Sequence, residues 1–146
     1  MSAALLDVNV LIALLDPGHV NFDAAHSWQR NHRGAAWATC PLTVNGCLRI
    51  LNTSTYPGIC VTPTEVAEIL RELCERPNHE FWADDVSLLD VELFDLQQVQ
   101  GPRQLTDVYL LGLAVKHGGH LVTFDRSIPV RAVRGAKASH LKILVS

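Results

Sequence analysis

Residues 3–15 read AALLDVNVLIALL and carry the strongest fold signal in the chain. The apolar residues 3–6 predict a short strand that is buried on both faces, as strands of parallel sheets are. Asp7 follows this strand directly, and Asn9 is placed to cap a helix over residues 10–15. The turn sequence DPG ends that helix. Because an unpartnered carboxylate at the end of a buried strand is costly, Asp7 is a candidate functional residue.

Two later segments also place an acid at the end of an element. Residues 121–124 (LVTF) predict a second buried strand, and Asp125 follows it. Thr106 is placed to cap a helix that the glycines at 118–119 end, and Asp107 lies in the first turn of that helix. Each acid also has a purely structural interpretation. Asp107 complements the helix dipole, and Asp125 is a turn residue.

The remaining expected elements alternate between helix and strand. They are a helix over 20–32, a strand over 35–38, helices over 41–51 and 63–75, and a strand over 141–145. Residues 79–100 give no clear assignment. The alternation predicts an α/β sandwich around a mostly parallel sheet. Since no linker divides the chain, we expect a single domain over residues 1–146.

The three acids predict a shared site. In open α/β sheets, ligands bind beyond the carboxyl ends of the strands, so Asp7, Asp107 and Asp125 are expected to converge there. Converging carboxylates repel one another unless a cation neutralises them, and Mg²⁺ or Mn²⁺ prefers oxygen ligands. Such an ion orients a phosphate and stabilises developing negative charge. The chemistry that this arrangement suits is hydrolysis of a phosphodiester.

The composition is that of a globular protein, and its charge is unevenly placed. Apolar residues make up 48% of the 146 residues and charged ones 18%, which excludes intrinsic disorder. A net charge of −3 excludes a protein that holds nucleic acid by bulk charge alone. Residues 1–125 sum to −8 and residues 126–146 to +5. The basic end is either a solvated tail or a basic lip beside an acidic site.

Cysteine spacing and hydropathy indicate the compartment. The four cysteines form no CxxC pair and follow no zinc-binding spacing. The apolar start is too short for a secretory signal, and no run of 18 apolar residues predicts a transmembrane helix. We therefore expect reduced thiols in a cytoplasmic protein without membrane contact.

Three motifs in order resemble those of PIN domains: LLDVNVLI at 5–12, LTDVYLL at 105–111 and LVTFDR at 121–126. In addition, TVNGCLRIL at 43–51 resembles the central helix of one VapC toxin subfamily. The resemblance implies a PIN-like three-layer sandwich and a Mg²⁺- or Mn²⁺-dependent endoribonuclease. It further implies the toxin half of a toxin–antitoxin pair, with RNA as the substrate, a VapB-like antitoxin as the partner and a homodimeric toxin.

The resemblance also assigns roles by position. Asp7, Asp107 and Asp125 correspond to the catalytic, metal-binding acids of the family. Thr123 falls where a hydroxyl residue supports the last acid, and Asn9 falls where a polar residue follows the first.

One acid of the family pattern is missing. The family places a further acid, commonly Glu, on the central helix three residues before an arginine. Counting back from Arg49, that position is Gly46, and no Asp or Glu occurs from residue 24 to residue 64. Fewer carboxylates favour one bound ion over two. Two replacements remain open: the neutral oxygen of Asn45, or one of four later acids, Asp84, Asp85, Asp90 and Asp95.

Two arginines and the tryptophans have alternative interpretations. Arg49 is placed either to hold a phosphate or the antitoxin, or to form a surface ion pair. Arg126, beside Asp125, is placed to neutralise substrate charge. Trp28, Trp37 and Trp82 are interpreted as core or interface residues, with base stacking as the alternative.

Three other functions compete with this interpretation. The missing acid favours a catalytically weak module that binds RNA or the antitoxin. A metal-free ribonuclease that uses histidine stays open, although no pair among the seven histidines carries a supporting motif. A phosphatase or nucleotide-binding fold is disfavoured, because the sequence DVN at 7–9 lacks the second Asp of a D-x-D site and the chain has no G-x-G-x-x-G and no P-loop.

Overall fold

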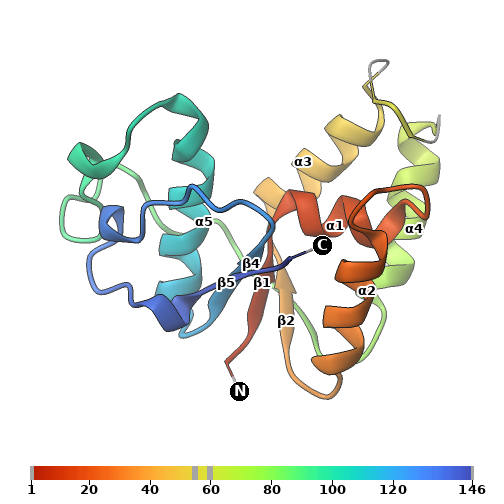
Figure 1. The fold of residues 1–146 in the computed structure, drawn as a ribbon, viewed down its shortest axis with the longest axis horizontal. Helices are drawn as coiled ribbons and strands as arrows, with labels where there is room; N and C mark the ends of the chain where they lie inside the picture. Colours follow the sequence, from red (N-terminus) through yellow and green to blue (C-terminus); the bar gives the residue numbers. More distant parts are fainter. Residues whose placement is uncertain (1, 54–55, 59–60, 146) are drawn as a thin grey trace.

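A parallel sheet of five short strands organises the computed structural model, which describes residues 2–53, 56–58 and 61–145 (Figure 1). Its strand order is β3-β2-β1-β4-β5, so the first strand in the chain is the central one. The strands are β1 (Ala4–Leu6), β2 (Trp37–Thr39), β3 (His79–Phe81), β4 (His120–Thr123) and β5 (Leu141–Ile143). All neighbouring pairs are parallel, so the carboxyl ends of all five strands lie at one edge of the sheet.

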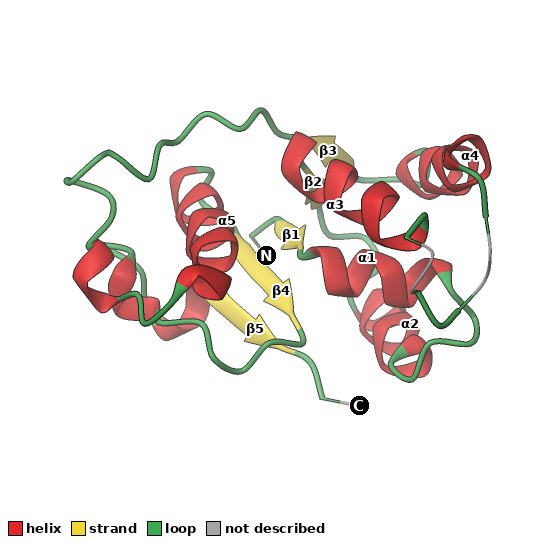
Figure 2. Ribbon diagram, turned by 90° about the horizontal axis from the view of Figure 1, so that it is seen from above, coloured by secondary structure: helices red, strands yellow, loops and turns green. Residues whose placement is uncertain are grey.

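Helices cover both faces of this sheet. They are α1 (Val8–Leu15), α2 (Phe22–Asn31), α3 (Pro41–Leu51), α4 (Pro63–Cys74) and α5 (Leu105–Lys116). Seen from above, α1 to α4 lie on one side of the strands, and α5 lies on the other with the loops that precede and follow it (Figure 2). This is the expected three-layer α/β sandwich around a parallel sheet. Within the described residues, no helix is long and apolar enough to cross a membrane.

The apolar start of the chain is buried between two cores. Ala4 and Leu6 pack into the core formed with α1 to α4, whereas Leu5 packs into the core formed with α5. All three residues of β1 are buried, because successive side chains of a strand point to opposite faces and both faces are covered. Continuous apolarity therefore predicted this strand, and the prediction is confirmed.

Both predicted helix caps near the acids are wrong. Asp7, and not Asn9, caps α1: its carboxylate accepts a hydrogen bond from the backbone N–H of Val8, and the helix begins two residues earlier than predicted. Thr106 does not cap α5, because that helix begins at Leu105 and directly continues the 3₁₀ turn Pro102–Gln104. Asn9 and Thr106 are thereby free to serve the site described below.

The unassigned stretch 79–100 contains the edge strand β3 and a 3₁₀ turn, Leu96–Gln98. The strand has no apolar run because it lies at the edge of the sheet with its side chains largely in solvent, and Phe81 is 62% exposed. The predicted glycine stop after α5 is confirmed. Gly118 has a φ of 69°, and a Cβ on Gly119 would lie 2.4 Å from the carbonyl oxygen of Ala3.

Candidate functional site

The register of the two central strands brings Asp7 and Thr123 together. β1 and β4 pair Leu6 with Val122, and the backbone N–H of Asp7 donates to the carbonyl of Val122 at 2.9 Å. The hydroxyl of Thr123 then donates to Oδ2 of Asp7 at 2.7 Å. Asp7 is 5% exposed and Thr123 is wholly buried. Two residues that are 116 positions apart thus form one buried polar pair at the carboxyl edge of the sheet.

The hydroxyl of Thr123 also accepts two hydrogen bonds. The side-chain amide of Asn9 donates to it at 3.3 Å, and the backbone N–H of Asp125 donates at 3.0 Å. The amide oxygen of Asn9 in turn accepts the backbone N–H of Phe124 at 3.3 Å. These bonds tie the first turn of α1 to the end of β4. Asn9 and Thr123 therefore fix the position of the acids around them.

Asp107 and Asp125 form a second pair. Their carboxyl groups are hydrogen-bonded to each other, and Oδ1 of Asp125 also accepts the backbone N–H and the hydroxyl of Ser127, at 2.8 and 2.7 Å. Burial, this bond and the charges of Asp7 and Asp125 raise the pKa of Asp107 to about 8. The bonds from Asp107 and Ser127 lower the pKa of Asp125. Below about pH 8, this pair therefore favours holding one proton, which lies mainly on Asp107.

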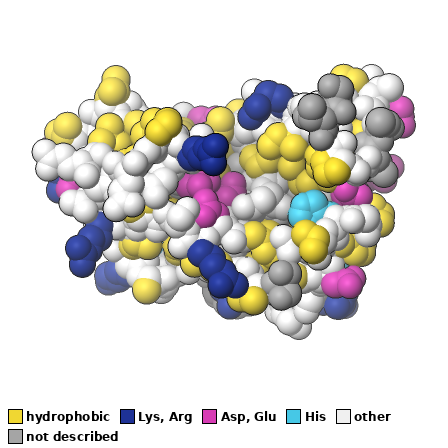
Figure 3. Space-filling model, turned by 45° about the horizontal axis from the view of Figure 1, so that its top comes forward, with side chains coloured by type: hydrophobic (Ala, Val, Ile, Leu, Met, Phe, Trp, Pro, Cys, Tyr) yellow, Lys and Arg dark blue, Asp and Glu magenta, His cyan; other side chains and the backbone are white. Residues whose placement is uncertain are grey.

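All three acids line one pocket of about 510 Å³ at the carboxyl edge of the sheet. Burial raises the pKa of Asp7, against the hydrogen bonds from Thr123 and Val8, and the charge of Asp125 adds to the rise. Asp and Glu side chains gather at the centre of this face, with Lys or Arg side chains on either side (Figure 3). The acids are thus close enough to shift one another's pKa and to face a common ligand.

The opposite wall of the pocket contains residues that the sequence reasoning missed. The missed residues are His19 and Tyr56, whereas Asn45 and Arg49 of α3, which also line the pocket, were predicted as supporting residues. The hydroxyl of Tyr56 donates to Oδ2 of Asp16, a carboxylate that is 2% exposed and whose Oδ1 accepts the N–H of Gly18. Asp16 had only the signature of a helix-ending turn, and no motif in the sequence marks Tyr56.

The structure explains why α3 carries no acid at the position of Gly46. This glycine is buried against α1, and a Cβ there would lie 2.7 Å from Cγ2 of Val8. Two replacements for the missing acid were predicted, and the first of them, Asn45, lines the acidic pocket. The other alternative is wrong, since Asp84, Asp85, Asp90 and Asp95 do not line this pocket. Asp84, for example, accepts the backbone N–H of Leu42 instead.

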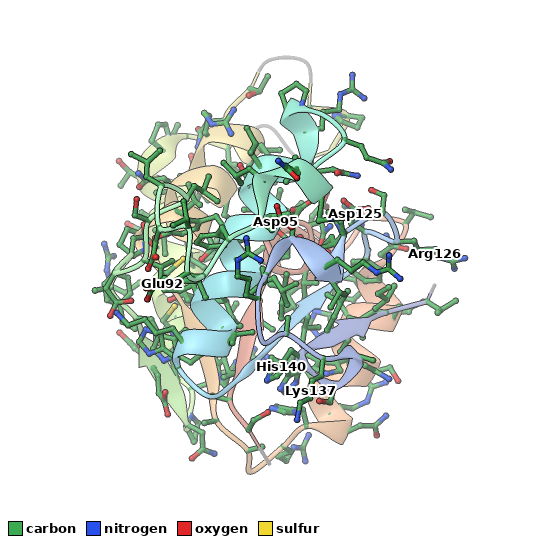
Figure 4. The ribbon with its side chains drawn as sticks, turned by 90° about the vertical axis from the view of Figure 1, so that its left-hand side faces the viewer. Glu92, Asp95, Asp125, Arg126, Lys137 and His140 are labelled. Carbon is green, nitrogen blue, oxygen red and sulfur yellow. The ribbon has the colours of Figure 1, made fainter. Side chains whose placement is uncertain are left out.

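The two arginines differ in placement. Arg49 lines the pocket, and no acid among the described residues lies within ion-pair distance of it, so the surface ion pair is not formed. Arg126 follows Asp125 but points outward and does not line the pocket (Figure 4). Lys137 lies toward the opposite end of the molecule in the same view. Among the residues that the structure describes, none of the basic residues after Asp125 therefore lines the acidic pocket.

The donor set fits a hard divalent cation. It offers carboxylate oxygens from Asp7, Asp107 and Asp125 and an amide oxygen from Asn45, which are ligand types that Mg²⁺ and Mn²⁺ prefer. Across residues 2–53, 56–58 and 61–145, no three acidic, histidine or cysteine side chains already surround one metal position. Both oxygens of Asp7 are engaged in hydrogen bonds, and Asp107 and Asp125 share a proton. Cation binding must therefore compete with these bonds.

Comparison with known proteins yields one family and several close relatives. The model of the PIN domain family matches residues 4–133. Over 141 residues, the chain is 44% identical to "Ribonuclease VapC44" of Mycobacterium tuberculosis. This match covers 97% of this chain and 99% of that protein. It is 39% identical over 132 residues to "Ribonuclease VapC39" and 40% identical over 128 residues to "Ribonuclease VapC38" of the same organism. These matches cover 90% and 86% of this chain, and 95% and 86% of the two relatives.

Proposed function

Because this chain belongs to the PIN domain family, we propose that it is a metal-dependent endoribonuclease and the toxin of a toxin–antitoxin pair. The observation that carries the proposal is the convergence of three carboxylates, from three separate segments, on one pocket. The relatives are named ribonucleases, which supports catalysis over the binding-only alternative. Phosphodiester hydrolysis is the reaction class that such a site suits.

In this proposal, Asp7, Asp107 and Asp125 hold a divalent cation, Mg²⁺ or Mn²⁺. When bound, such an ion supplies Lewis-acid stabilisation of the negative charge that develops on the phosphate. Thr123 and Asn9 act on the acids: the hydroxyl of Thr123 orients Asp7, and Asn9 holds that hydroxyl in place. Loss of the proton shared by Asp107 and Asp125 gives the charge that a cation requires.

The wall opposite the acids binds the substrate. Arg49 reaches the pocket without an acidic partner, and its planar guanidinium suits an RNA phosphate. Asn45 lies one residue from the position of the missing acid and offers a neutral amide. Because it adds no negative charge, the site has three carboxylates, which favours a single ion. Arg126, outside the pocket, is placed to attract the RNA backbone.

The resemblance to VapC toxins extends the proposal to partners. We infer that a VapB-like antitoxin binds this chain and that the chain forms a homodimer. RNA is abundant in the cytoplasm, and free thiols at Cys40, Cys47 and Cys74 fit its reducing conditions. Co-expression with the antitoxin from a neighbouring reading frame should relieve growth arrest in bacteria, whereas expression of the chain alone should cause it.

The decisive test is cleavage of structured RNA by the purified protein. We expect cleavage with Mg²⁺ or Mn²⁺ and none in EDTA. Asp7→Ala should abolish cleavage, but this substitution also removes the cap of α1 and the partner of Thr123. Asp7→Asn is the matched variant, because the amide keeps an oxygen that can accept from Val8. Equal cleavage by the wild type and a folded Asp7→Asn variant would refute the assigned site.

A further inference from the structure

A second pocket, of about 320 Å³, lies at the amino-terminal edge of the sheet. It is formed by the end of α2, by residues 33–35 ahead of β2 and by residues 76–78 ahead of β3. Leu6 of β1 also lines this second pocket, whereas the acids line a separate pocket at the carboxyl edge of the sheet. The size of this second pocket is at the lower end of the range for small-molecule sites, roughly 300–1,000 Å³.

Two tryptophans form apolar walls of this pocket, namely Trp28 of α2 and Trp37 of β2. Each has a histidine ring against it. Trp28 stacks on His32 with ring centroids 4.7 Å apart, and Trp37 lies 4.6 Å from His79. His32 is itself fixed by a hydrogen bond of 3.1 Å between its Nε2 and the carbonyl oxygen of Ala36. These contacts hold both indole rings in fixed orientations. Trp37 is only 7% exposed, so the half-buried Trp28 is the ring available for stacking.

Three arginines also line the pocket: Arg30, Arg33 and Arg76. All three are exposed, and none has a carboxylate within ion-pair distance among the residues that the structure describes. The guanidinium of Arg76 donates to the side-chain oxygen of Gln29 at 3.0 Å, which fixes its position beside the pocket. Three unneutralised guanidinium groups around an aromatic cavity attract an anion.

Asn78 adds a polar group to this pocket, in an uncommon backbone conformation. Its φ is 69°, the only positive φ at a non-glycine position in the described part of the chain. Its carbonyl oxygen accepts the backbone N–H of Trp37 at 3.0 Å, so the backbone is tied to the sheet while the side-chain amide is left to the pocket. An amide can both donate to and accept from the edge of a nucleobase.

We propose that this pocket binds a nucleoside monophosphate, either free or as the terminal nucleotide of an RNA. The base lies against the tryptophan wall, where stacking tolerates any base. The phosphate binds the arginines, whose planar forks match its oxygens. A pocket of about 320 Å³ suits a single nucleotide better than an extended acidic peptide, which needs a longer groove. This site is independent of the acids and of the proposed nuclease activity.

The test is titration calorimetry of the full chain with AMP in EDTA, where the acidic pocket repels phosphate. We expect saturable binding at a single site. Adenosine and inorganic phosphate, which each offer half of the ligand, should bind more weakly than AMP. Arg76→Gln should weaken AMP binding about tenfold, since it removes one charge-assisted contact. Arg71 lies on α4, which ends at Cys74 just before Arg76, and it lies outside this pocket, so Arg71→Gln should leave AMP binding unchanged.

The comparison of AMP with a 5′-phosphorylated oligoadenylate identifies the source of the nucleotide. Binding of either supports the proposal, and the tighter ligand indicates whether a free nucleotide or an RNA end is preferred. Three results would overturn it: no saturable binding of either probe at millimolar concentration, equal weakening by Arg76→Gln and Arg71→Gln, or binding of an acidic peptide in place of AMP. An unchanged melting temperature of Arg76→Gln shows that a loss of binding is not a loss of folding.

Discussion

The two ends of the sheet carry opposite charges and are built differently. At the carboxyl edge, Asp7 and Asp125 follow the two adjacent central strands, and Thr123 links them through hydrogen bonds. At the amino edge, Arg30, Arg33 and Arg76 lie on a helix end, a loop and a turn. Within the described part of the chain, Arg76 alone of the three has a side-chain hydrogen-bond partner, Gln29. The acids are buried or half-buried, whereas the arginines are exposed.

This difference follows from the two kinds of charge. Carboxylates that converge must be held against mutual repulsion, so they require short, rigid elements and buried hydrogen bonds. Guanidinium groups are hydrated weakly and sit on long side chains, so they can gather around a cavity from exposed surface positions with few side-chain partners. The acidic end is thus organised for chemistry on a bound ion, and the basic end for capture of an anion.

The largest expected effect comes from removing one charged side chain at each end of the sheet, Asp107 from the acidic pocket or Arg76 from the basic pocket. Asp107→Asn removes a carboxylate from the acidic pocket and should lower RNA cleavage about 100-fold or more, because electrostatic stabilisation at the reacting phosphate is lost. The same variant should bind AMP like the wild type. Arg76→Gln should show the reverse pattern. Cleavage rates and calorimetry on both variants measure this.

Asp107 is only partly buried, so the substitution should not unfold the chain. A loss of both activities in either variant would show that the two ends are coupled, and the comparison between independent sites would then fail.

The sequence predicted the elements whose signal is local. Continuous apolarity marked β1 and β4, and the proline and cap residues marked α3 and α4, whose predicted starts at residues 41 and 63 are confirmed. The edge strand β3 was not predicted, because an exposed edge needs no apolar run. The cap of α1 was misplaced because Asp7 serves two roles, as helix cap and as site residue.

The sequence predicted those site residues that lie in recognisable motifs. The three acids were found because each follows a strand or begins a helix. Tyr56 was missed, since its place in the pocket depends on a hydrogen bond to Asp16, 40 residues earlier. Asn45 and the four later acids were not distinguishable in sequence, because only the packing of α3 against α1 decides which side chain enters the pocket.

An intermediate effect is expected at Gly46, where the family acid is missing. Gly46→Glu should lower the free energy of unfolding by about 1–3 kcal/mol, because the new side chain meets Val8 and separates α3 from α1. It should therefore lower cleavage, although it restores the family's residue type. Urea denaturation and RNA cleavage measure the two effects.

Asn45→Glu is the matched control, since residue 45 is exposed and already lines the pocket. It should leave stability nearly unchanged. A Gly46→Glu variant that is as stable as the wild type and cleaves faster would show that α1 and α3 leave room for an acid after all.

The smallest expected effect is a pH dependence of stability confined to the acidic end. Folding raises the pKa of Asp107 from 3.8 to about 8, so its stabilising contribution is complete below about pH 4 and is lost as the pH rises through 8. The lowered pKa of Asp125 acts in the opposite direction, but only below its ordinary value of 3.8. In EDTA, the free energy of unfolding should therefore fall between pH 5 and pH 8. Solvent screening of the partly exposed Asp107 keeps the change below about 1 kcal/mol.

Asp107→Asn should reduce this slope but not abolish it, because burial also raises the pKa of Asp7. Asp23→Asn on the exposed surface of α2 should keep the slope in full. Mg²⁺ competes with the shared proton, so it should raise the melting temperature more at pH 8 than at pH 5. A slope that is unchanged in Asp107→Asn would show that Asp107 is not the group that titrates. The two ends of the sheet would then differ in the sign of their charge, but proton binding by Asp107 would not contribute to folding stability. No carboxylate among the described residues lines the basic pocket.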